Sequence, residues 1–145
     1  MDLSCIISDI IQSAVTKGAS DVTVSVFCNK ETKVKIECKD FVFPAKANEL
    51  RSFGYEYIFD GNCNSDGGIL EFVSSLPVGR AEDFCVSIMS ANPKLEEFRL
   101  VYTKDDNEYV FSRNETLVLL GDVFIGEYNV LMWIEEEIST KIASL

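Results

Sequence analysis

The sequence predicts an α+β domain, a two-layer α/β sandwich in which helices cover one face of a mixed sheet. The length of 145 residues, 47% of them hydrophobic, suits one domain with its own core. Apolar residues recur at helical spacing near both ends of the chain and alternate with polar residues in between. The expected order is helix, two strands, helix, a meander of strands and a closing helix. Because no repeat or linker interrupts it, residues 1–145 are expected to form a single domain.

The first elements have the clearest patterns. Residues 3–15 carry apolar side chains at three- and four-residue spacing, which predicts an amphipathic helix of about four turns ended by Gly18. Valines alternate with polar residues over 22–26, and a similar alternation covers 33–38. With the turn of residues 29–32 between them, these runs predict a hairpin of two half-buried strands.

The middle of the chain is less regular. Residues 45–53 are expected to carry a short helix, and residues 54–68 form a loop rich in Gly, Asn and Asp. A second helix is predicted over 69–76, where it begins after two glycines and ends at Pro77.

The second half predicts more strands and a closing helix. Strands are expected over 84–90, 97–102 and 109–111, followed by a more apolar strand over 116–120. The last helix is predicted over 128–143. Its expected buried side chains are Val130, Leu131, Ile134, Ile138 and Ile142.

The chain contains no histidine and five widely spaced cysteines. Without imidazole, Ser-His-Asp and Cys-His nucleophiles, histidine-containing zinc and iron sites and phospho-accepting histidines are excluded. An odd number of cysteines without a C-x-x-C pair indicates neither a disulfide framework nor a zinc site, and favours a reducing, intracellular location. No signal peptide is expected, because the N-terminus lacks a basic region followed by an apolar core. No membrane span is expected, because no window approaches about 18 uninterrupted apolar residues.

The formal charge of −11 argues against direct DNA binding. Affinity for a phosphate backbone comes from clustered Lys and Arg, which release counterions. The tightest basic group, at residues 30–39, is interleaved with Glu and Asp. It is interpreted as the solvated edge of the first hairpin rather than as a nucleic-acid site.

Four segments resemble, in the same order, the N-terminal ATPase domain of the MutL mismatch-repair family, a branch of the GHKL superfamily with its Bergerat fold. Residues 7–19, ISDIIQSAVTKGA, are similar to the family's I-K-E-L-V-E-N-S-L-D-A-G-A helix. Residues 35–44, KIECKDFVFP, stand where a strand runs into D-N-G-x-G, and residues 67–76, GGILEFVSSL, stand in the place of G-E-A-L-x-S-I. Residues 119–124, LLGDVF, resemble the strand end V-x-D-L-F. The resemblance implies the GHKL type of sandwich.

The resemblance assigns vestigial roles to three polar residues. Asp9 stands where the family has its general-base Glu, and Ser13 stands where the family has the Asn that holds magnesium. Asp40 matches the Asp that accepts a hydrogen bond from the adenine amino group. Asp9 is one methylene shorter than Glu, and a base displaced by about 1 Å can lose about a hundredfold in rate. Ser13 offers only one hydroxyl to a cation that prefers oxygen ligands.

The expected nucleotide pocket is eroded. Gly67 and Gly68 stand at the family's phosphate-binding positions, but Val42 and Pro44 replace the glycines that follow the adenine-binding Asp. Neither replacement allows the backbone angles or close approach that glycine allows, and the side chains of Phe41 and Phe43 can fill the adenine cavity. Relative to the family, the leading helix and most of the nucleotide lid are missing.

Each of these residues also has a purely structural interpretation. Asp9 and Ser13 on the polar face of a helix are explained as solvated residues, and Asp40 as a turn former. Gly67 and Gly68 are equally explained as a flexible lead-in to a helix.

Two large apolar residues on the acidic closing helix also have two interpretations. Trp133 and Met132 belong either to the core or to an exposed interface patch.

The first functional hypothesis is a degenerate MutL-like domain without ATP turnover, a pseudoenzyme with a structural or interaction role in DNA mismatch repair or meiotic recombination. It implies a protein partner, such as a catalytic MutL-type paralogue, and a nuclear location in a eukaryote. It implies no cofactor, membrane or direct DNA binding. Two alternatives stay open. One is a divergent ATPase that uses Asp9, Ser13 with Mg²⁺, and Asp40 with ATP; the other is a stand-alone acidic protein-binding module.

Overall fold

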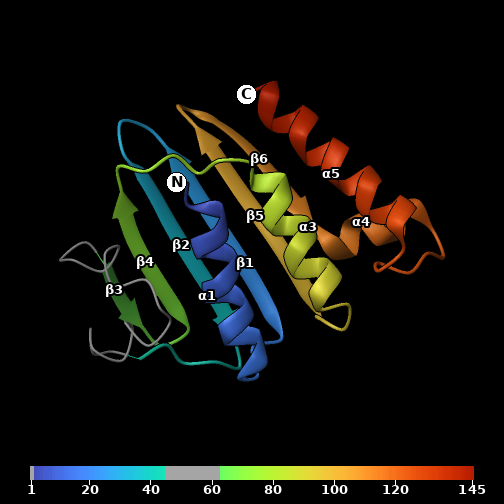
Figure 1. Ribbon diagram of the computed structural model, residues 1–145, viewed down its shortest axis with the longest axis horizontal. Coiled ribbons are helices and arrows are strands. Elements are labelled where there is room, and N and C mark those ends of the chain that lie inside the picture. Colours follow the sequence, from blue (N-terminus) through green and yellow to red (C-terminus); the bar gives the residue numbers. More distant parts are fainter. Residues whose placement is uncertain (1, 45–62) are drawn as a thin grey trace.

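The computed structural model describes residues 2–44 and 63–145, which contain four helices and six strands (Figure 1). The short helix predicted for 45–53 and most of the loop predicted for 54–68 lie outside the described residues. The helices are α1 (Ser4–Thr16), α3 (Ala81–Ala91), α4 (Arg113–Leu120) and α5 (Tyr128–Ala143), and the strands are β1 (Asp21–Cys28), β2 (Thr32–Lys39), β3 (Cys63–Asp66), β4 (Ile69–Ser74), β5 (Glu97–Lys104) and β6 (Asn107–Ser112).

The six strands form one sheet in the order β3-β4-β2-β1-β5-β6. β1 runs parallel to β5, and the other neighbouring pairs are antiparallel, so the sheet is mixed, as predicted. α1 and α3 lie side by side across one face of the sheet, and α5 packs beside α3 near β6 (Figure 1). The predicted α+β class is confirmed, and the arrangement is compatible with a two-layer sandwich.

Alternation in the central strands explains why the sheet has one apolar face. Val24 of β1 is fully buried and lies between Ile36 of β2 and Leu100 of β5, both of which are also buried. Burying a side chain of this size stabilises the fold by about 1.5–3 kcal/mol. α1 covers this face with its predicted apolar stripe. The buried side chains of α1 are Ile6, Ile7, Ile10, Ile11 and Ala14.

The helix predicted over residues 69–76 is wrong, because this segment forms strand β4. Leu70 and Phe72 are buried, whereas Ile69 and Glu71 are more exposed, which is the two-residue period of a strand. β4 pairs with β2 on one side and with β3 on the other. So short an apolar run fits both the helical period and the strand period, and pairing with a distant strand decides between the two structures.

The strand predicted over residues 84–90 is also wrong, because these residues lie in α3. The buried residues Phe84, Cys85, Ile88 and Met89 recur at helical spacing. Two acidic residues, Glu82 and Asp83, occupy the first turn of the helix, where they interact favourably with its dipole.

The strand predicted over residues 116–120 is wrong as well, because these residues lie in α4. No side chain of α4 is fully buried, but Leu117 and Leu120 are half-buried against the core, whereas Val118 and Leu119 are exposed, which is the spacing of a helix. The helix begins at a side-chain cap, since the Glu115 N–H donates a hydrogen bond to Ser112 Oγ at 3.2 Å.

The closing helix is confirmed with the predicted bounds, 128–143. Three of its predicted core residues, Val130, Ile134 and Ile138, are buried. The strands predicted over 97–102 and 109–111 are confirmed within β5 and β6.

Candidate functional site

The polar residues that the sequence assigns to α1 lie in the helix layer. Asp9 is exposed and borders a shallow cavity between α1 and α3, together with Asp83 and Ser87 of α3. Ser13, one turn further along α1, is half-buried. The neighbourhood of Asp9 is thus acidic.

Asp40 directly follows β2 and has a left-handed backbone conformation, with φ of 60°. Its side chain is exposed and accepts a hydrogen bond from Ser20 Oγ at 3.3 Å. Asp tolerates this conformation better than most residues, so the structure supplies a local reason for an Asp here.

Gly67 and Gly68 form the two-residue turn between β3 and β4, and the prediction that they lead into a helix is wrong. The carbonyl of Gly68 accepts a hydrogen bond from the Cys38 N–H at 2.8 Å, and that of Gly67 accepts one from the Phe43 N–H at 2.8 Å. The turn therefore fastens the hairpin to the end of β2 and to the segment after it.

Gly68 is placed where no side chain fits. A Cβ atom at this position would lie 2.3 Å from the Cys38 carbonyl oxygen and 3.0 Å from that of Phe41. In the segment that follows β2, Phe43 is buried, and its ring packs edge-on against Phe41 with the ring centroids 4.9 Å apart. Two backbones approach each other closely here, and aromatic rings fill the space beside them.

The structure does not bring the polar residues of α1, Asp9 and Ser13, together with the turn of Gly67 and Gly68. Gly68 borders a cavity whose other lining residues include Thr23 and Glu37. These side chains alternate with the buried valines of the central strands, so this cavity lies on the face of the sheet opposite α1. Asp9, by contrast, lies in the helix layer.

The five cysteines are free thiols. Burial raises the pKa of the Cys38 and Cys63 thiols to about 12, and raises that of Cys85 well above its ordinary value. Since the thiolate is the nucleophile, these three residues are unreactive at neutral pH. Within residues 2–44 and 63–145, no group of three or more Cys, Asp or Glu side chains is arranged to hold a metal ion.

An exposed apolar surface stands out in the C-terminal part of the chain. Of the ten large hydrophobic residues that are exposed in the described part, seven lie between positions 110 and 133. Leu119 of α4 is 74% exposed, and Met132 and Trp133 of α5 are 44% and 37% exposed, which decides for the exposed alternative. We call these seven residues the C-terminal apolar surface. They are Val110, Val118, Leu119, Phe124, Tyr128, Met132 and Trp133.

Part of this surface lines a groove of about 180 Å³ where β6, α4 and α5 meet. Leu119 and Trp133 line it from the two helices, and Val110 lines it from the strand. Glu115 and Glu137 also line the groove. Burial and then the Glu137 carboxylate raise the pKa of Tyr109, on the groove wall, to about 12.

The charge around the C-terminal apolar surface has one sign. Residues 114–140 contain six acidic residues and neither Lys nor Arg. One of the six, Glu135, pairs with Arg80 at the start of α3, with 3.2 Å between Oε1 and Nη2. The acidic residues are Glu115, Asp122, Glu127, Glu135, Glu136 and Glu137.

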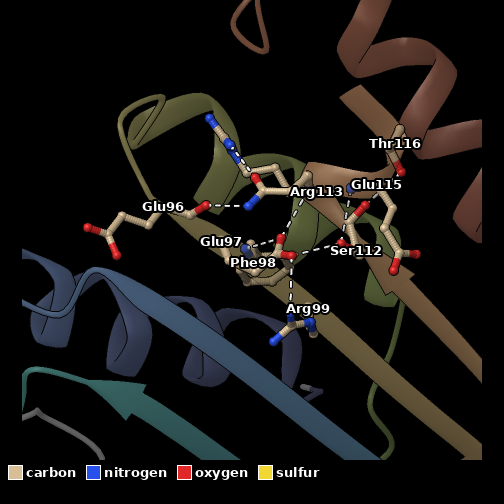
Figure 2. A network of polar contacts seen from close by, with 9 residues as sticks. Glu96, Glu97, Phe98, Arg99, Ser112, Arg113, Glu115 and Thr116 are labelled. Atoms are coloured by element: carbon tan, nitrogen blue, oxygen red, sulfur yellow. Dashed lines mark hydrogen bonds and ion pairs between the residues drawn. The ribbon is translucent and has the colours of Figure 1, made fainter. Parts of the chain in front are cut away.

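A buried carboxylate holds α4 in place beside the groove (Figure 2). Glu97 of β5 is 5% exposed and accepts hydrogen bonds from Ser112 Oγ at 2.8 Å and from the Asn114 N–H at 3.1 Å. Arg99 pairs with the same carboxylate at 3.5 Å. The end of β6 and the first turn of α4 are thereby tied to β5, which sets the direction in which α4 leaves the sheet.

A second set of contacts anchors the start of α4 to the loop before β5. The Arg113 guanidinium donates a hydrogen bond to the Pro93 carbonyl at 2.9 Å, and the Asn114 side-chain amide donates one to the Glu96 carbonyl at 2.6 Å. Because no side chain of α4 is fully buried, these polar contacts and those of Glu97 position the helix together with the half-buried Leu117 and Leu120.

Comparisons of the chain with protein-family models, curated proteins and solved structures find no match. Of the four segments that resemble MutL, residues 7–19 and 35–44 have the implied helix and strand. Residues 67–76 form a turn and a strand, and residues 119–124 lie at the end of α4 and after it, so both differ from the implied structure. No helix in the described parts of the chain is long and apolar enough to cross a membrane.

Proposed function

We propose that this chain is a non-catalytic protein-binding domain whose binding site is the C-terminal apolar surface. The observation that carries the proposal is the exposure of large apolar side chains, Trp133 among them, within one stretch of chain and inside an acidic surround. Exposed apolar patches rimmed by polar residues mark protein interaction sites. Trp, Tyr and Met are also enriched where proteins meet.

The positions of the residues suggested for catalysis support the non-catalytic part of the proposal. Asp9 lies in the helix layer, whereas Gly68 borders a cavity on the other face of the sheet. A general base acts only within hydrogen-bond reach of the reacting group. Gly67 and Gly68 are also explained by the hairpin turn alone.

The MutL-like, GHKL-type identity of the domain and its setting in mismatch repair or meiotic recombination stay part of this proposal as predictions. They rest on the resemblance of residues 7–19 and 35–44, whose secondary structure agrees with it. A catalytic MutL-type paralogue is therefore the first partner to test.

The test measures how a purified candidate partner binds to two matched variants. Leu119→Asp places a charge in the C-terminal apolar surface. Ile69→Asp places the same charge at an exposed apolar residue of β4, outside that surface. We expect Leu119→Asp to raise Kd at least about tenfold, or about 1.4 kcal/mol, in calorimetry. Ile69→Asp is expected to change Kd by less than about twofold. Equal effects of the two variants would exclude the C-terminal apolar surface as the binding site.

The ATPase alternative is tested by thermal melting with and without Mg-ATP. A nucleotide at about 100 times its Kd stabilises the fold by about 2.7 kcal/mol. We expect no such stabilisation. A rise in Tm that Asp40→Ala abolishes would support nucleotide binding instead.

A further inference from the structure

The two edges of the sheet differ in their capacity to accept another strand. β3, at one edge, has four residues, Cys63–Asp66, three of which are polar. β6, at the other edge, has six residues and contains Tyr109, Val110 and Phe111. It pairs with β5 alone among the described strands. Proteins commonly block edge strands with Lys, Pro or a bulge, and β6 contains neither Lys nor Pro and keeps an uninterrupted register with β5.

The hairpin geometry determines which backbone groups of β6 are free. A two-residue turn, Asp105 and Asp106, joins β5 to β6, so Lys104 and Asn107 form the first hydrogen-bonded pair. Hydrogen-bonded and non-hydrogen-bonded pairs alternate along an antiparallel ladder. The N–H and C=O of Val110, three residues further on, therefore point away from β5 and toward the outer edge.

The residues that line the groove beside this edge determine which side chains an added strand needs. Leu119 and Trp133 offer an apolar contact next to Val110, and Glu115 and Glu137 line the same groove. A strand presents alternate side chains to opposite faces. A segment in which apolar residues alternate with Lys or Arg therefore matches both the apolar and the acidic walls of the groove.

We propose that the occupant of the groove is an extended basic segment of a partner protein, which pairs with the outer edge of β6 as an added strand. Its apolar side chains contact Leu119 and Trp133, and its Lys or Arg side chains face Glu115 and Glu137. A second copy of this chain fits less well, because each copy carries a charge of −11 and would set acidic walls against each other. This inference rests on the proposed function, since it names the partner chemistry of the same surface.

Trp133 provides the readout, because it is the one tryptophan of the chain. The probe is a synthetic peptide of about eight residues in which Val and Lys alternate. We expect it to shift the Trp133 emission to the blue and to bind more weakly as salt rises from about 50 to about 300 mM. A peptide with Glu in place of Lys, and one with N-methylated amides on its pairing edge, are both expected to bind at least about tenfold more weakly.

Matched variants place the binding on the edge strand. Val110→Lys puts a positive charge on the pairing edge, and Val42→Lys puts the same charge at an exposed valine that follows β2, outside the C-terminal apolar surface and the groove lining. We expect Val110→Lys to weaken peptide binding at least about tenfold and Val42→Lys to change it less than about threefold. Circular dichroism and urea unfolding of both variants separate a binding effect from a folding effect.

Several results would overturn the proposal. Equal binding of the N-methylated peptide would exclude strand pairing, and equal binding of the acidic peptide would exclude charge recognition. A dimer in sedimentation that Val110→Lys dissociates would make a second copy the occupant. If Leu119→Asp disrupts partner binding while the basic peptide does not bind, the proposed function stands and this inference fails. If neither Leu119→Asp nor Val110→Lys affects any binding, both fail.

Discussion

Gly68 shows how one residue type can be required for two different reasons. The resemblance to MutL implies a glycine that lets phosphate approach the backbone, whereas the structure places Gly68 against two backbone carbonyls. We expect Gly68→Ala to lower the free energy of unfolding by about 2–3 kcal/mol, because neither carbonyl can move aside as a flexible side chain would. Urea unfolding without any nucleotide measures this effect.

The neighbouring glycine is the matched control. A Cβ atom on Gly67 would meet nothing within 4 Å, but its φ of 60° is left-handed. Gly67→Ala is therefore expected to lower the free energy of unfolding by only about 1 kcal/mol. Equal effects of the two substitutions would show that backbone crowding is not the reason for Gly68.

Among the helices, α4 depends most on polar contacts, since none of its side chains is fully buried. Glu97→Ala removes the acceptor for the Ser112 hydroxyl and the Asn114 N–H. We expect a loss of about 3 kcal/mol in the free energy of unfolding, because buried donors lose a charged acceptor. Amide hydrogen exchange should also accelerate at Asn114 and Glu115, at the start of α4.

Glu96→Ala is the control for this substitution. Glu96 is exposed, and its part in the contacts around α4 comes from its backbone carbonyl, which alanine retains (Figure 2). We expect a change within about 0.5 kcal/mol. A similar loss for both variants would mean that Glu97 does not hold α4.

The elements differ in how far the sequence predicts them. α1, the β1–β2 hairpin and α5 were predicted because each has a long, one-sided pattern of buried residues. β4, α3 and α4 were assigned the wrong type. β4 and the run within α3 are short enough to fit either the helical or the strand period, and α4 has only a half-buried face.

At the scale of the whole molecule, buried thiols make the free energy of unfolding depend on pH in the alkaline range. Burial raises the pKa of Cys38 from 9.0 to about 12, and the Asp21 carboxylate adds to the shift. The folded state therefore holds the proton more tightly than the unfolded state. This contribution to stability is fully present below about pH 9 and is lost as the pH rises toward about 12.

We expect the free energy of unfolding to fall between about pH 7 and about pH 10.5, and to fall by about 2 kcal/mol less in Cys38→Ala. Urea unfolding followed by Trp133 fluorescence measures both proteins at the two pH values. Cys38→Ala also loses packing at every pH, so the comparison uses the difference between the two pH values. Parallel losses in both proteins would contradict the assignment to Cys38.

The candidate binding site was only partly visible in the sequence. Trp133 and Met132 were recognised as either core or exposed, because an acidic helix with large apolar residues on more than one side is compatible with both. Leu119 was assigned to a strand and to the segment that resembles V-x-D-L-F, not to an interaction surface. Its exposure follows from the direction of α4, which the Glu97 contacts fix and in which Leu117 and Leu120, rather than Leu119, face the core.

The amino-acid pattern was sufficient for the class of fold, the elements at the two ends of the chain and the apolar face of the central strands, because a one-sided core leaves its period in the local sequence. It was not sufficient for the sheet order, for the strand character of β4 or for the exposed groove beside β6. Each of these depends on segments that are distant in the chain: β4 on its pairing with β2, and the groove on where α4 and α5 meet β6. Contacts between distant segments have no local period, so they appear only when the chain is folded.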